Sequence, residues 1–191
     1  VIKSYLEPRF EAEFSPQSYG YRPLKNAHQA VEQVRKNVRY HHWVIDMDIS
    51  GFFDNMSHEH LQKAIERHVK EKWAKMYITR WLQAPIEDRK GNIRIREGKG
   101  TPQGGVISPL LANLFLHYAF DKWLEITYPG LCFVRYADDI IVHCNSQAEA
   151  EEVLRAIKKR LGECKLELNE KKTRIVYCKK NHRKDKFKTV Q

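Results

Sequence analysis

The chain has 191 residues, of which 42% are hydrophobic and 30% charged, a balance typical of a globular domain rather than of a disordered segment. No stretch approaches the roughly 20 apolar residues of a membrane-spanning helix, and the acids near the N-terminus exclude a signal peptide, so no membrane association is expected. The formal charge of +10 is concentrated in residues 165–191, where ten Lys and Arg face three Asp and Glu, and such a segment favours a nucleic-acid partner over a merely solvated tail.

The first 42 residues predict two helices joined by a loop. The chain starts without an initiating Met, as expected of an excised fragment. Apolar spacing indicates a helix over residues 2–14, although Pro8 should break or end its first turns. Residues 14–23, FSPQSYGYRP, predict a loop because Pro and Gly interrupt regular structure. A second helix is expected over residues 24–39, with these residues on its buried face: Ala27, Ala30, Val31, Val34 and Val38.

Residues 43–54, WVIDMDISGFFD, begin with an alternation of period two that predicts a β-strand. One face of the strand is apolar and consists of Trp43, Ile45, Met47 and Ile49. The other face carries Asp46 and Asp48, so Asp48 lies where the strand ends. The order helix, strand, helix favours an α/β arrangement of layers over a helical bundle.

Residues 57–85 predict helical structure that begins at Ser57 and ends before Pro85. The expected buried stripe consists of Leu61, Ala64, Ile65, Val69, Trp73, Tyr77, Ile78, Trp81 and Leu82. At this helical spacing, the three aromatic residues are expected in the core rather than on an exposed platform for stacking bases.

A short basic hairpin and a glycine-rich loop follow. Residues 93–96 alternate apolar and basic side chains, which predicts a hairpin with Arg94 and Arg96 facing outward, where they are candidates for contacts with template or primer phosphates. Residues 98–108, GKGTPQGGVIS, form a loop whose glycines let the backbone approach a ligand closely. The loop leads into a buried helix over residues 109–127, with Ser108 as its N-cap.

Residues 133–144, FVRYADDIIVHC, predict a β-hairpin whose tight turn presents Asp138 and Asp139. Two adjacent anions repel each other unless a cation lies between them, although an isolated Asp pair is also compatible with an ordinary turn. Together with Asp48, the pair would supply the anionic oxygen ligands that Mg²⁺ requires. The proximity of these carboxylates is a hypothesis, because Asp138 follows Asp48 by 90 residues.

The C-terminal part predicts a capped helix and two short strands. Residues 146–149 form a capping box, and the helix that follows should end near Gly162. Strands are expected near residues 166–168 and 175–176. The four cysteines, Cys132, Cys144, Cys164 and Cys178, include no CxxC pair, which favours free thiols in a reducing cytoplasm over a zinc site or a disulfide framework.

Four blocks in this order resemble the reverse transcriptases encoded by group II introns, over nearly the whole chain. They are SYGYRP (18–23), DISGFFD (48–54), TPQGGVISPLLANLFL (101–116) and YADD (136–139). The resemblance implies an α/β (α+β) polymerase palm, with an antiparallel sheet backed by helices, plus part of the fingers. It implies a partial fingers region at 1–42, the palm at 43–178, and a basic segment at 179–191 leading toward an absent thumb.

The resemblance also implies roles for individual residues. Catalysis would depend on Asp48, Asp138 and Asp139, which would hold two Mg²⁺ ions together with the carbonyl of Ile49. The incoming nucleotide would meet Phe53, Pro102, Gln103, Gly104, Tyr136 and Lys172. Nucleic acid would contact Arg22, Arg94, Arg96, Lys179, Lys180, Arg183 and Lys184.

Three of these roles have a structural alternative. Phe53 either lies beneath the sugar and excludes a 2′-hydroxyl or belongs to the core. Lys172 either helps to protonate the departing pyrophosphate or is a solvated turn lysine. Arg22 either approaches a phosphate or RNA, or is a structural arginine.

The function that the resemblance implies is RNA-directed DNA synthesis in the bacterial cytoplasm, supporting intron mobility and splicing. Its partners would be an RNA template, including the group II intron RNA, a DNA primer and a dNTP. The isolated chain should be weakly active or inactive, and its oligomeric state is open. The alternatives are an RNA-binding maturase module with little polymerase activity, a bacterial reverse transcriptase outside group II introns, and an RNA-templated RNA polymerase, against which Phe53 favours DNA synthesis.

Overall fold

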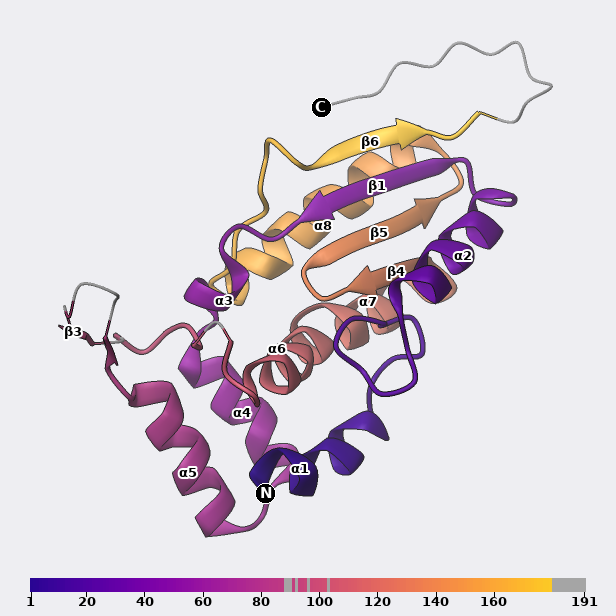
Figure 1. Ribbon diagram of the computed structural model, residues 1–191. Helices are drawn as coiled ribbons and strands as arrows, with labels where there is room; N and C mark the ends of the chain where they lie inside the picture. Colours follow the sequence, from indigo (N-terminus) through magenta and orange to yellow (C-terminus); the bar gives the residue numbers. More distant parts are fainter. Residues whose placement is uncertain (88–90, 92, 96, 103, 180–191) are drawn as a thin grey trace. The chain divides into compact units, whose positions relative to one another are not determined.

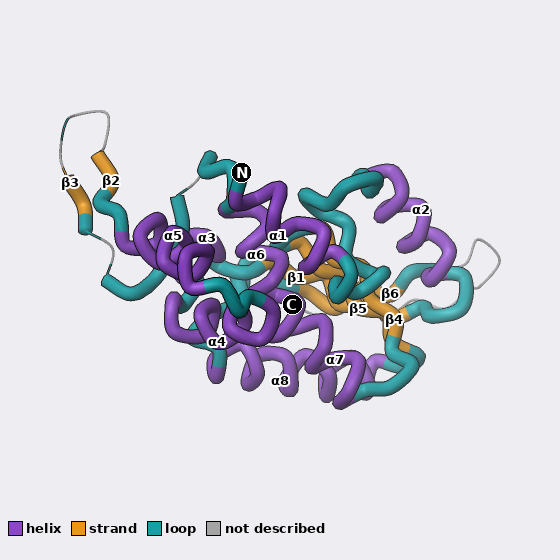
Figure 2. The backbone as a smooth tube through the Cα atoms, turned by 90° about the horizontal axis from the view of Figure 1, so that it is seen from below, coloured by secondary structure: helices purple, strands orange, loops and turns teal. Residues whose placement is uncertain are grey.

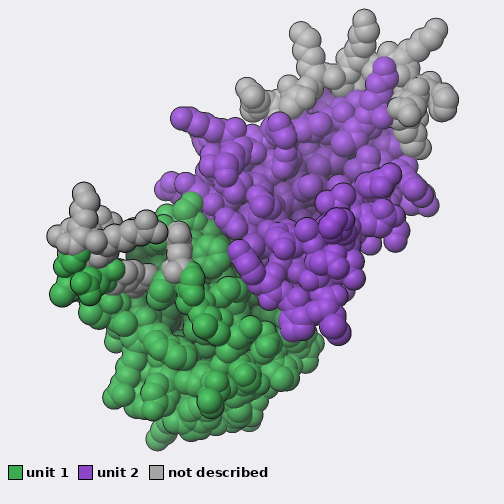
Figure 3. Space-filling view, viewed as in Figure 1, with its two compact units in different colours: residues 1–14, 51–118 green, residues 15–50, 119–191 purple. Residues whose placement is uncertain are grey.

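The computed structural model describes residues 1–87, 91, 93–95, 97–102 and 104–179, excluding the side chains of Ile86 and Arg94 (Figure 1). The chain forms two compact units (Figure 3). Unit 1 consists of residues 1–14 and 51–118, and unit 2 of residues 15–50 and the chain from 119 onward. Each unit therefore combines segments that are distant in the sequence.

Unit 2 contains a four-stranded antiparallel sheet with the strand order β4-β5-β1-β6. The strands are β1 (Trp43–Asp48), β4 (Cys132–Tyr136), β5 (Asp139–Cys144) and β6 (Arg174–Tyr177). In β1 the apolar face is buried, whereas Asp46 and Asp48 are half-buried, so the predicted alternation is confirmed. Of the two strands expected near the C-terminus, the second is β6, and the first is reduced to an isolated bridge between Leu168 and Ile49.

Helices cover both faces of this sheet. The helices of unit 2 are α2 (Ala27–Val38), α7 (Lys122–Thr127) and α8 (Gln147–Glu163). Figure 2 shows the sheet between α2 on one side and α7 and α8 on the other. As predicted, Ser146 caps α8 by accepting a hydrogen bond from the amide of Glu149, whose carboxylate accepts from the amide of Asn145. The buried face of α8, which packs on β1, β5 and β6, holds Ala150, Val153, Ile157 and Leu161.

The predicted buried face of α2 is wrong in part. Ala27 and Val31 are exposed, and the buried residues are Ala30 and Asn37. The helix begins later than expected because Asn26 caps it in a capping box with Gln29. Since α2 packs mainly on β4 and β5, a narrow stripe of the helix is enough to cover them.

Unit 1 is mainly helical. Its elements are α1 (Ile2–Glu11), α3 (Phe52–Asn55), α4 (His58–His68), α5 (Lys72–Gln83), α6 (Ser108–Leu116), β2 (Ile86–Glu87) and β3 (Ile93–Arg94). Helix α1 continues through Pro8, contrary to the prediction. Pro8 lies on the exposed side, whereas Ile2, Leu6 and Phe10 are buried, so the packing of that face keeps the helix intact despite the lost hydrogen bond.

The aromatic residues of α5 are not in the core, which corrects the prediction. Trp73, Tyr77 and Trp81 are 43%, 44% and 41% exposed, and the buried stripe is Ala74, Ile78 and Leu82. The physical reason is a break between α4, which ends at His68, and α5, which starts at Lys72. The helical phase of the α4 stripe therefore does not carry over to Trp73, whose ring centroid lies 5.1 Å from that of Tyr5.

The predicted long helix is present with a wider turn in its middle, but its burial is wrong in part, because Ile126 near its end is 71% exposed and Leu124 is the buried residue of α7. Residues 108–127 form α6, a π-helical segment η1 (His117–Asp121) and α7 in succession. Strands β2 and β3 pair as the expected hairpin, while Arg96 lies outside the described residues. Among the helices that the structure describes, none has the length and apolarity needed to cross a membrane.

Candidate active site

The three predicted catalytic carboxylates meet at one end of the sheet in unit 2. Asp48, the last residue of β1, is the register partner of Asp139, the first residue of β5. Tyr136 pairs with Asp139 at the other side of β5, so Ala137 and Asp138 make the two-residue turn between β4 and β5. Two strand ends that are distant in sequence therefore bring the three side chains to the same edge.

The charges of these carboxylates oppose one another. Partial burial, followed by the charge of Asp48, raises the pKa of Asp138. The pKa of Asp139 is raised by partial burial and then by the charges of Asp138 and Asp48. Carboxylate oxygens are the ligand type that a divalent cation such as Mg²⁺ prefers, and a cation at this edge would relieve the repulsion. In the described part of the chain, however, no three His, Cys, Asp or Glu side chains are arranged as a group that could hold a metal ion.

Lys172 lies against this acidic edge. Its Nζ is 3.1 Å from Oδ2 of Asp48, and the hydrogen bond with Asp48 is the main cause that raises the pKa of Lys172. The Lys172 side chain is 64% exposed, whereas that of Asp48 is 13% exposed. The ammonium group is therefore paired with Asp48 and still accessible from solvent, and its role toward the departing pyrophosphate stays a prediction.

Asn169 is a residue of the site that the sequence alone did not indicate. Its amide donates to the carbonyl of Asp48 (2.8 Å), and its side-chain Nδ2 donates to Oδ2 of the same residue (3.3 Å). The carbonyl of Asn169 accepts a hydrogen bond from the amide of Lys172 (3.0 Å), which completes the turn that carries the lysine. The block LELNEKKT contains Asn169, but nothing in its pattern points to a contact 121 residues back in the chain.

Ile49 continues β1 into an isolated antiparallel bridge with Leu168. The two hydrogen bonds of this bridge run from the amide of Ser50 to the carbonyl of Glu167 and from the amide of Asn169 to the carbonyl of Asp48, both at 2.8 Å. The bridge thus engages the carbonyl of Asp48 rather than that of Ile49. The predicted role of the Ile49 carbonyl as an oxygen ligand stays a prediction.

A hollow of about 320 Å³ opens beside the carboxylates. It is lined by Asp46, Met47, Asp48, Asp139, Lys171, Lys172 and Arg174. Arg174 is held in place by Asp46, with Nη2 and Oδ2 2.8 Å apart. The hollow therefore has acidic side chains suited to a cation and basic side chains suited to an anionic ligand such as a phosphate.

Phe53 and the glycine-rich loop belong to unit 1. Phe52 is buried against Phe115, whereas Phe53 is half-buried, so only one of the two adjacent rings enters the core as expected. The carbonyl of Phe53 accepts a hydrogen bond from the amide of Thr101 (2.7 Å), which ties α3 to the loop. Because its ring is only half-buried, part of Phe53 is accessible to a ligand. Its role at the sugar stays a prediction.

The loop after Thr101 is braced by Ser108. The hydroxyl of Ser108 donates to the carbonyl of Pro102 (2.8 Å) and accepts from Oγ1 of Thr101 (2.9 Å), so Ser108 does not cap α6 as expected. Gly104 has φ +83°, a conformation that favours glycine, and is exposed. Gln103 lies outside the described residues.

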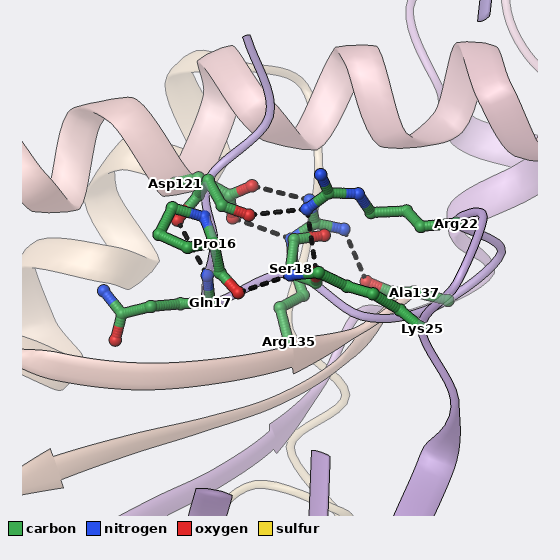
Figure 4. Close-up of polar contacts among 9 residues, drawn as sticks. Pro16, Gln17, Ser18, Arg22, Lys25, Asp121, Arg135 and Ala137 are labelled. Atoms are coloured by element: carbon green, nitrogen blue, oxygen red, sulfur yellow. Dashed lines mark hydrogen bonds and ion pairs between the residues drawn. The ribbon is translucent and has the colours of Figure 1, made fainter. Parts of the chain in front are cut away.

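The remaining predicted contacts fall into two groups. Arg22 is half-buried and donates from Nη1 to the carbonyls of Ser15 (2.6 Å) and Ser18 (2.8 Å), which supports its interpretation as a structural arginine (Figure 4). Tyr136 is half-buried at the end of β4, and Lys179 is exposed after β6. The described residues do not include these predicted nucleic-acid contacts: Arg96, Lys180, Arg183, Lys184 and the side chain of Arg94.

Solved structures share this fold. Apo telomerase from Candida tropicalis, truncated from its C-terminal domain, superposes with a TM-score of 0.74 at 13% identity, over 99% of this chain and 42% of that one. A second structure of telomerase from the same organism, in complex with a TWJ fragment of telomeric RNA, gives a TM-score of 0.73 at 12% identity, over 92% of this chain and 33% of that one. At these identities the likeness concerns the fold alone, and it confirms the predicted α/β palm-like architecture.

Relatives that are similar in sequence include the following two. Protein YkfC of Escherichia coli (strain K12) is 29% identical over 208 residues, which cover 89% of this chain and 54% of YkfC. The group II intron-encoded protein LtrA of Lactococcus lactis subsp. cremoris is 33% identical over 125 residues, which cover 65% of this chain and 20% of LtrA. The chain therefore spans about half of YkfC and a smaller part of LtrA.

The family comparison covers almost the whole chain. A model described as reverse transcriptase (RNA-dependent DNA polymerase) matches residues 1–189. This range includes the strands that carry Asp48, Asp138 and Asp139 as well as the glycine-rich loop. The chain belongs to the reverse transcriptase (RNA-dependent DNA polymerase) family.

Proposed function

We propose that this chain is the polymerase region of a group II intron-encoded reverse transcriptase, which extends a DNA primer on an RNA template. The observation that carries the proposal is the register of the sheet, in which Asp48 faces Asp139 beside the turn residue Asp138. The likeness to LtrA adds the association with a group II intron. In this assignment residues 1–42 belong to the fingers and residues 43–178 to the palm.

Two Mg²⁺ ions would be held by Asp48, Asp138 and Asp139, with the carbonyl of Ile49 as a further oxygen ligand. When bound, such ions supply Lewis-acid chemistry at the primer 3′-hydroxyl and at the leaving phosphate. The carboxylates of this chain orient the two reacting groups, because their strand ends are fixed by the sheet. Their raised pKa values are consistent with a need for positive charge at this edge.

Lys172 has a separate task in this proposal. The hydrogen bond with Asp48 raises the pKa of Lys172, so this side chain keeps its proton to a higher pH than an unpaired lysine does. From the wall of the hollow, the ammonium group would donate that proton to the departing pyrophosphate as a general acid. Asn169 supports this task by fixing the turn that carries Lys172.

Residues of unit 1 would select the nucleotide, and exposed cations would hold the nucleic acid. Phe53 would exclude a 2′-hydroxyl at the sugar, and Gln103 and Gly104 would line the pocket for the nucleotide and the template base, in a loop that Pro102 shapes. Tyr136 would also contact the incoming nucleotide. Phosphates would be held without base recognition by the following cations: Arg94, Arg96, Lys179, Lys180, Arg183 and Lys184. Arg22 is omitted from this surface because its guanidinium already bonds two loop carbonyls.

A second candidate is a bacterial reverse transcriptase outside group II introns. It is favoured by the likeness to YkfC, which covers 89% of this chain, whereas the likeness to LtrA covers 65%. The carboxylate chemistry would be the same, and the difference would lie in the RNA that serves as template and in any contribution to splicing.

The test is primer extension by the full-length protein. A DNA primer annealed to an RNA template is offered with dNTPs and, separately, with rNTPs, in Mg²⁺ and in EDTA. We expect Mg²⁺-dependent extension with dNTPs only. Extension with rNTPs but not with dNTPs would point to an RNA polymerase. Tight binding of intron RNA without extension would point to a maturase module.

A further inference from the structure

Arg135 is a large side chain that is fully buried directly behind the carboxylate turn. It lies on β4, and its fork donates from Nε to Oδ1 of Asp121 (2.7 Å) and from Nη2 to Oδ2 (2.6 Å). Both side chains are 0% exposed. A buried pair recovers its desolvation cost only through such geometry, and removing one partner leaves a charge uncompensated. The pair therefore fixes the direction of the guanidinium.

The same guanidinium reaches the turn itself. Its Nη1 donates to the carbonyl of Ala137 (3.1 Å), in the peptide that joins Ala137 to Asp138 (Figure 4). Ala137 has φ +57°, a left-handed conformation that a residue with a side chain rarely adopts. The hydrogen bond from Arg135 thus holds in place a turn that would otherwise tend to relax.

A loop over residues 15–22 supports β4 from its open edge. Ser18 forms a parallel bridge with Arg135, in which Arg135 donates its amide to the carbonyl of Gln17 (2.9 Å) and accepts from the amide of Tyr19 (2.8 Å). The side-chain carbonyl of Gln17 accepts from the amide of Phe133 (2.8 Å). The loop thus acts as an additional strand beside β4.

Two cations hold the loop in this shape. Arg22 bonds the carbonyls of Ser15 and Ser18, and Nζ of Lys25 donates to the carbonyls of Pro16 (2.5 Å) and Ser18 (2.9 Å). Figure 4 shows both side chains folded back onto the loop. Their positive charges are directed at main-chain oxygens of the loop, which makes the loop a rigid support.

Gly20 brings this loop against the turn. A Cβ atom at Gly20 would lie 2.4 Å from the amide nitrogen of Ala137 and 3.0 Å from the carbonyl carbon of Tyr136. Both are main-chain atoms, which cannot move aside unless the turn moves with them. Gly20 is therefore required by close approach.

We propose that Arg135, Asp121 and the loop over residues 15–22 form a turn clamp that positions Asp138 and Asp139 against Asp48. Arg135 and Asp121 hold the turn from the interior, and Gly20 holds it from the loop side. Arg135 and Asp121 are fully buried and Gly20 lies against the main chain of the turn, so these groups act through the turn as positioning residues. The clamp rests on the proposed function only where polymerase activity is the readout.

The first test compares two Gly→Ala substitutions in the full-length protein. Gly20→Ala pushes on the turn without removing a side chain, whereas Gly162→Ala in α8 is the control, since a Cβ there meets nothing within 4 Å. For Gly20→Ala we expect kcat to fall by up to about 100-fold, as for a catalytic group misplaced by an ångström, with little change in the KM for dNTP. Hydrogen exchange in residues 133–142 should accelerate for this variant only.

The second test removes the ion pair as a whole. Replacing a buried pair with apolar residues of similar size is often neutral for stability, so Arg135→Met with Asp121→Leu should fold. It nevertheless removes the donor to the Ala137 carbonyl, and kcat should fall as for Gly20→Ala. Val153→Ala in α8 is the control, because it lowers stability at a buried site in the half of the helix that follows the far end of β5, and it should leave kcat unchanged.

These readouts separate the clamp from the proposed function. If the wild-type protein extends no primer, the proposed function fails, and hydrogen exchange still decides the clamp. Exchange and kcat at wild-type levels in both Gly20→Ala and the double variant would overturn the clamp. A loss of kcat that follows melting temperature alone, with Val153→Ala equally impaired, would also overturn it.

Discussion

Asp48 and Asp139 are register partners at the end of β1 and β5, although 90 residues separate them in the chain. Opposite positions on antiparallel strands place side chains about 5 Å apart at Cβ, where two like charges destabilise the sheet. With Asp138 in the adjoining turn, three carboxylates repel one another at this edge of the sheet. A cation bound there would remove the repulsion, so this edge favours cation binding.

Asp138→Asn should abolish primer extension in the full-length protein and leave its fold intact. The substitution removes a proposed metal ligand, yet it also relieves repulsion in a group whose pKa is raised, so thermal stability should be unchanged or slightly higher. Extension assays and thermal melts measure the two effects. Glu152→Gln, on the exposed side of α8, is the charge-matched control and should extend normally. Retained extension by Asp138→Asn would remove Asp138 from the ligand set.

Phe53→Val should reduce discrimination against ribonucleotides. Valine is smaller than the half-buried ring that it replaces and would leave space at the sugar. We therefore expect kcat/KM for rNTPs to rise relative to that for dNTPs by tenfold or more, on the order of 1.4 kcal/mol. Single-nucleotide incorporation measures the ratio. Tyr77→Val, at an exposed aromatic of α5, is the control. If the ratio stays at its wild-type value, Phe53 serves the core instead.

His143 should make the fold sensitive to mild acid. The side chain is fully buried on β5, neither ring nitrogen has a hydrogen-bond partner among the described residues, and burial lowers its pKa from 6.5 to about 4. As the pH falls, His143 takes up its proton at a higher pH in the unfolded chain than in the folded one. The free energy of unfolding therefore has its full value above pH 6.5 and decreases by about 3 kcal/mol as the pH falls toward 4. Urea unfolding at several pH values measures this decrease.

His143→Leu should remove that part of the pH dependence while keeping an apolar group of similar size at the site. His28→Leu, at an exposed position of α2, is the control and should keep the wild-type profile. If the two variants have the same profile between pH 6.5 and 4, His143 is not the group that titrates.

RNA binding by this chain should be weak and strongly dependent on salt. Contacts with phosphates release counterions, so log K should fall with log salt with a slope of about 0.7 to 0.9 per contact. Deleting residues 179–191, which hold six Lys and Arg and one Asp, should reduce that slope and the affinity at low salt. Fluorescence anisotropy with a labelled RNA measures both. A flat salt response, or no loss on deletion, would place the nucleic-acid surface elsewhere.

Local features of this protein were predictable because neighbouring residues alone establish them. The alternation in residues 43–48, the hairpin with a tight turn at Asp138, and the Ser146 cap all depend on contacts within a few residues, although Asp139, expected in the turn, begins β5. The resemblance of four short blocks then identified the family, because those blocks hold the residues that the site needs.

Some predictions depended on packing partners and were wrong for that reason. Trp73, Tyr77 and Trp81 have the spacing of a buried stripe, but α5 packs through Ala74, Ile78 and Leu82. Helical periodicity gives the spacing of a face, and only the neighbouring elements decide which face is buried.

The parts of the site that come from distant segments were decided by the tertiary structure. The sequence contains Asp48, Asn169, Asp121 and Arg135, but no local pattern pairs Asn169 with Asp48 or Asp121 with Arg135. Strand order and register are set by the burial of whole faces, since a slip of one residue would turn every side chain of a strand to the other face. The amino-acid sequence thus determined which carboxylates are present, and the packing of the sheet determined that they meet.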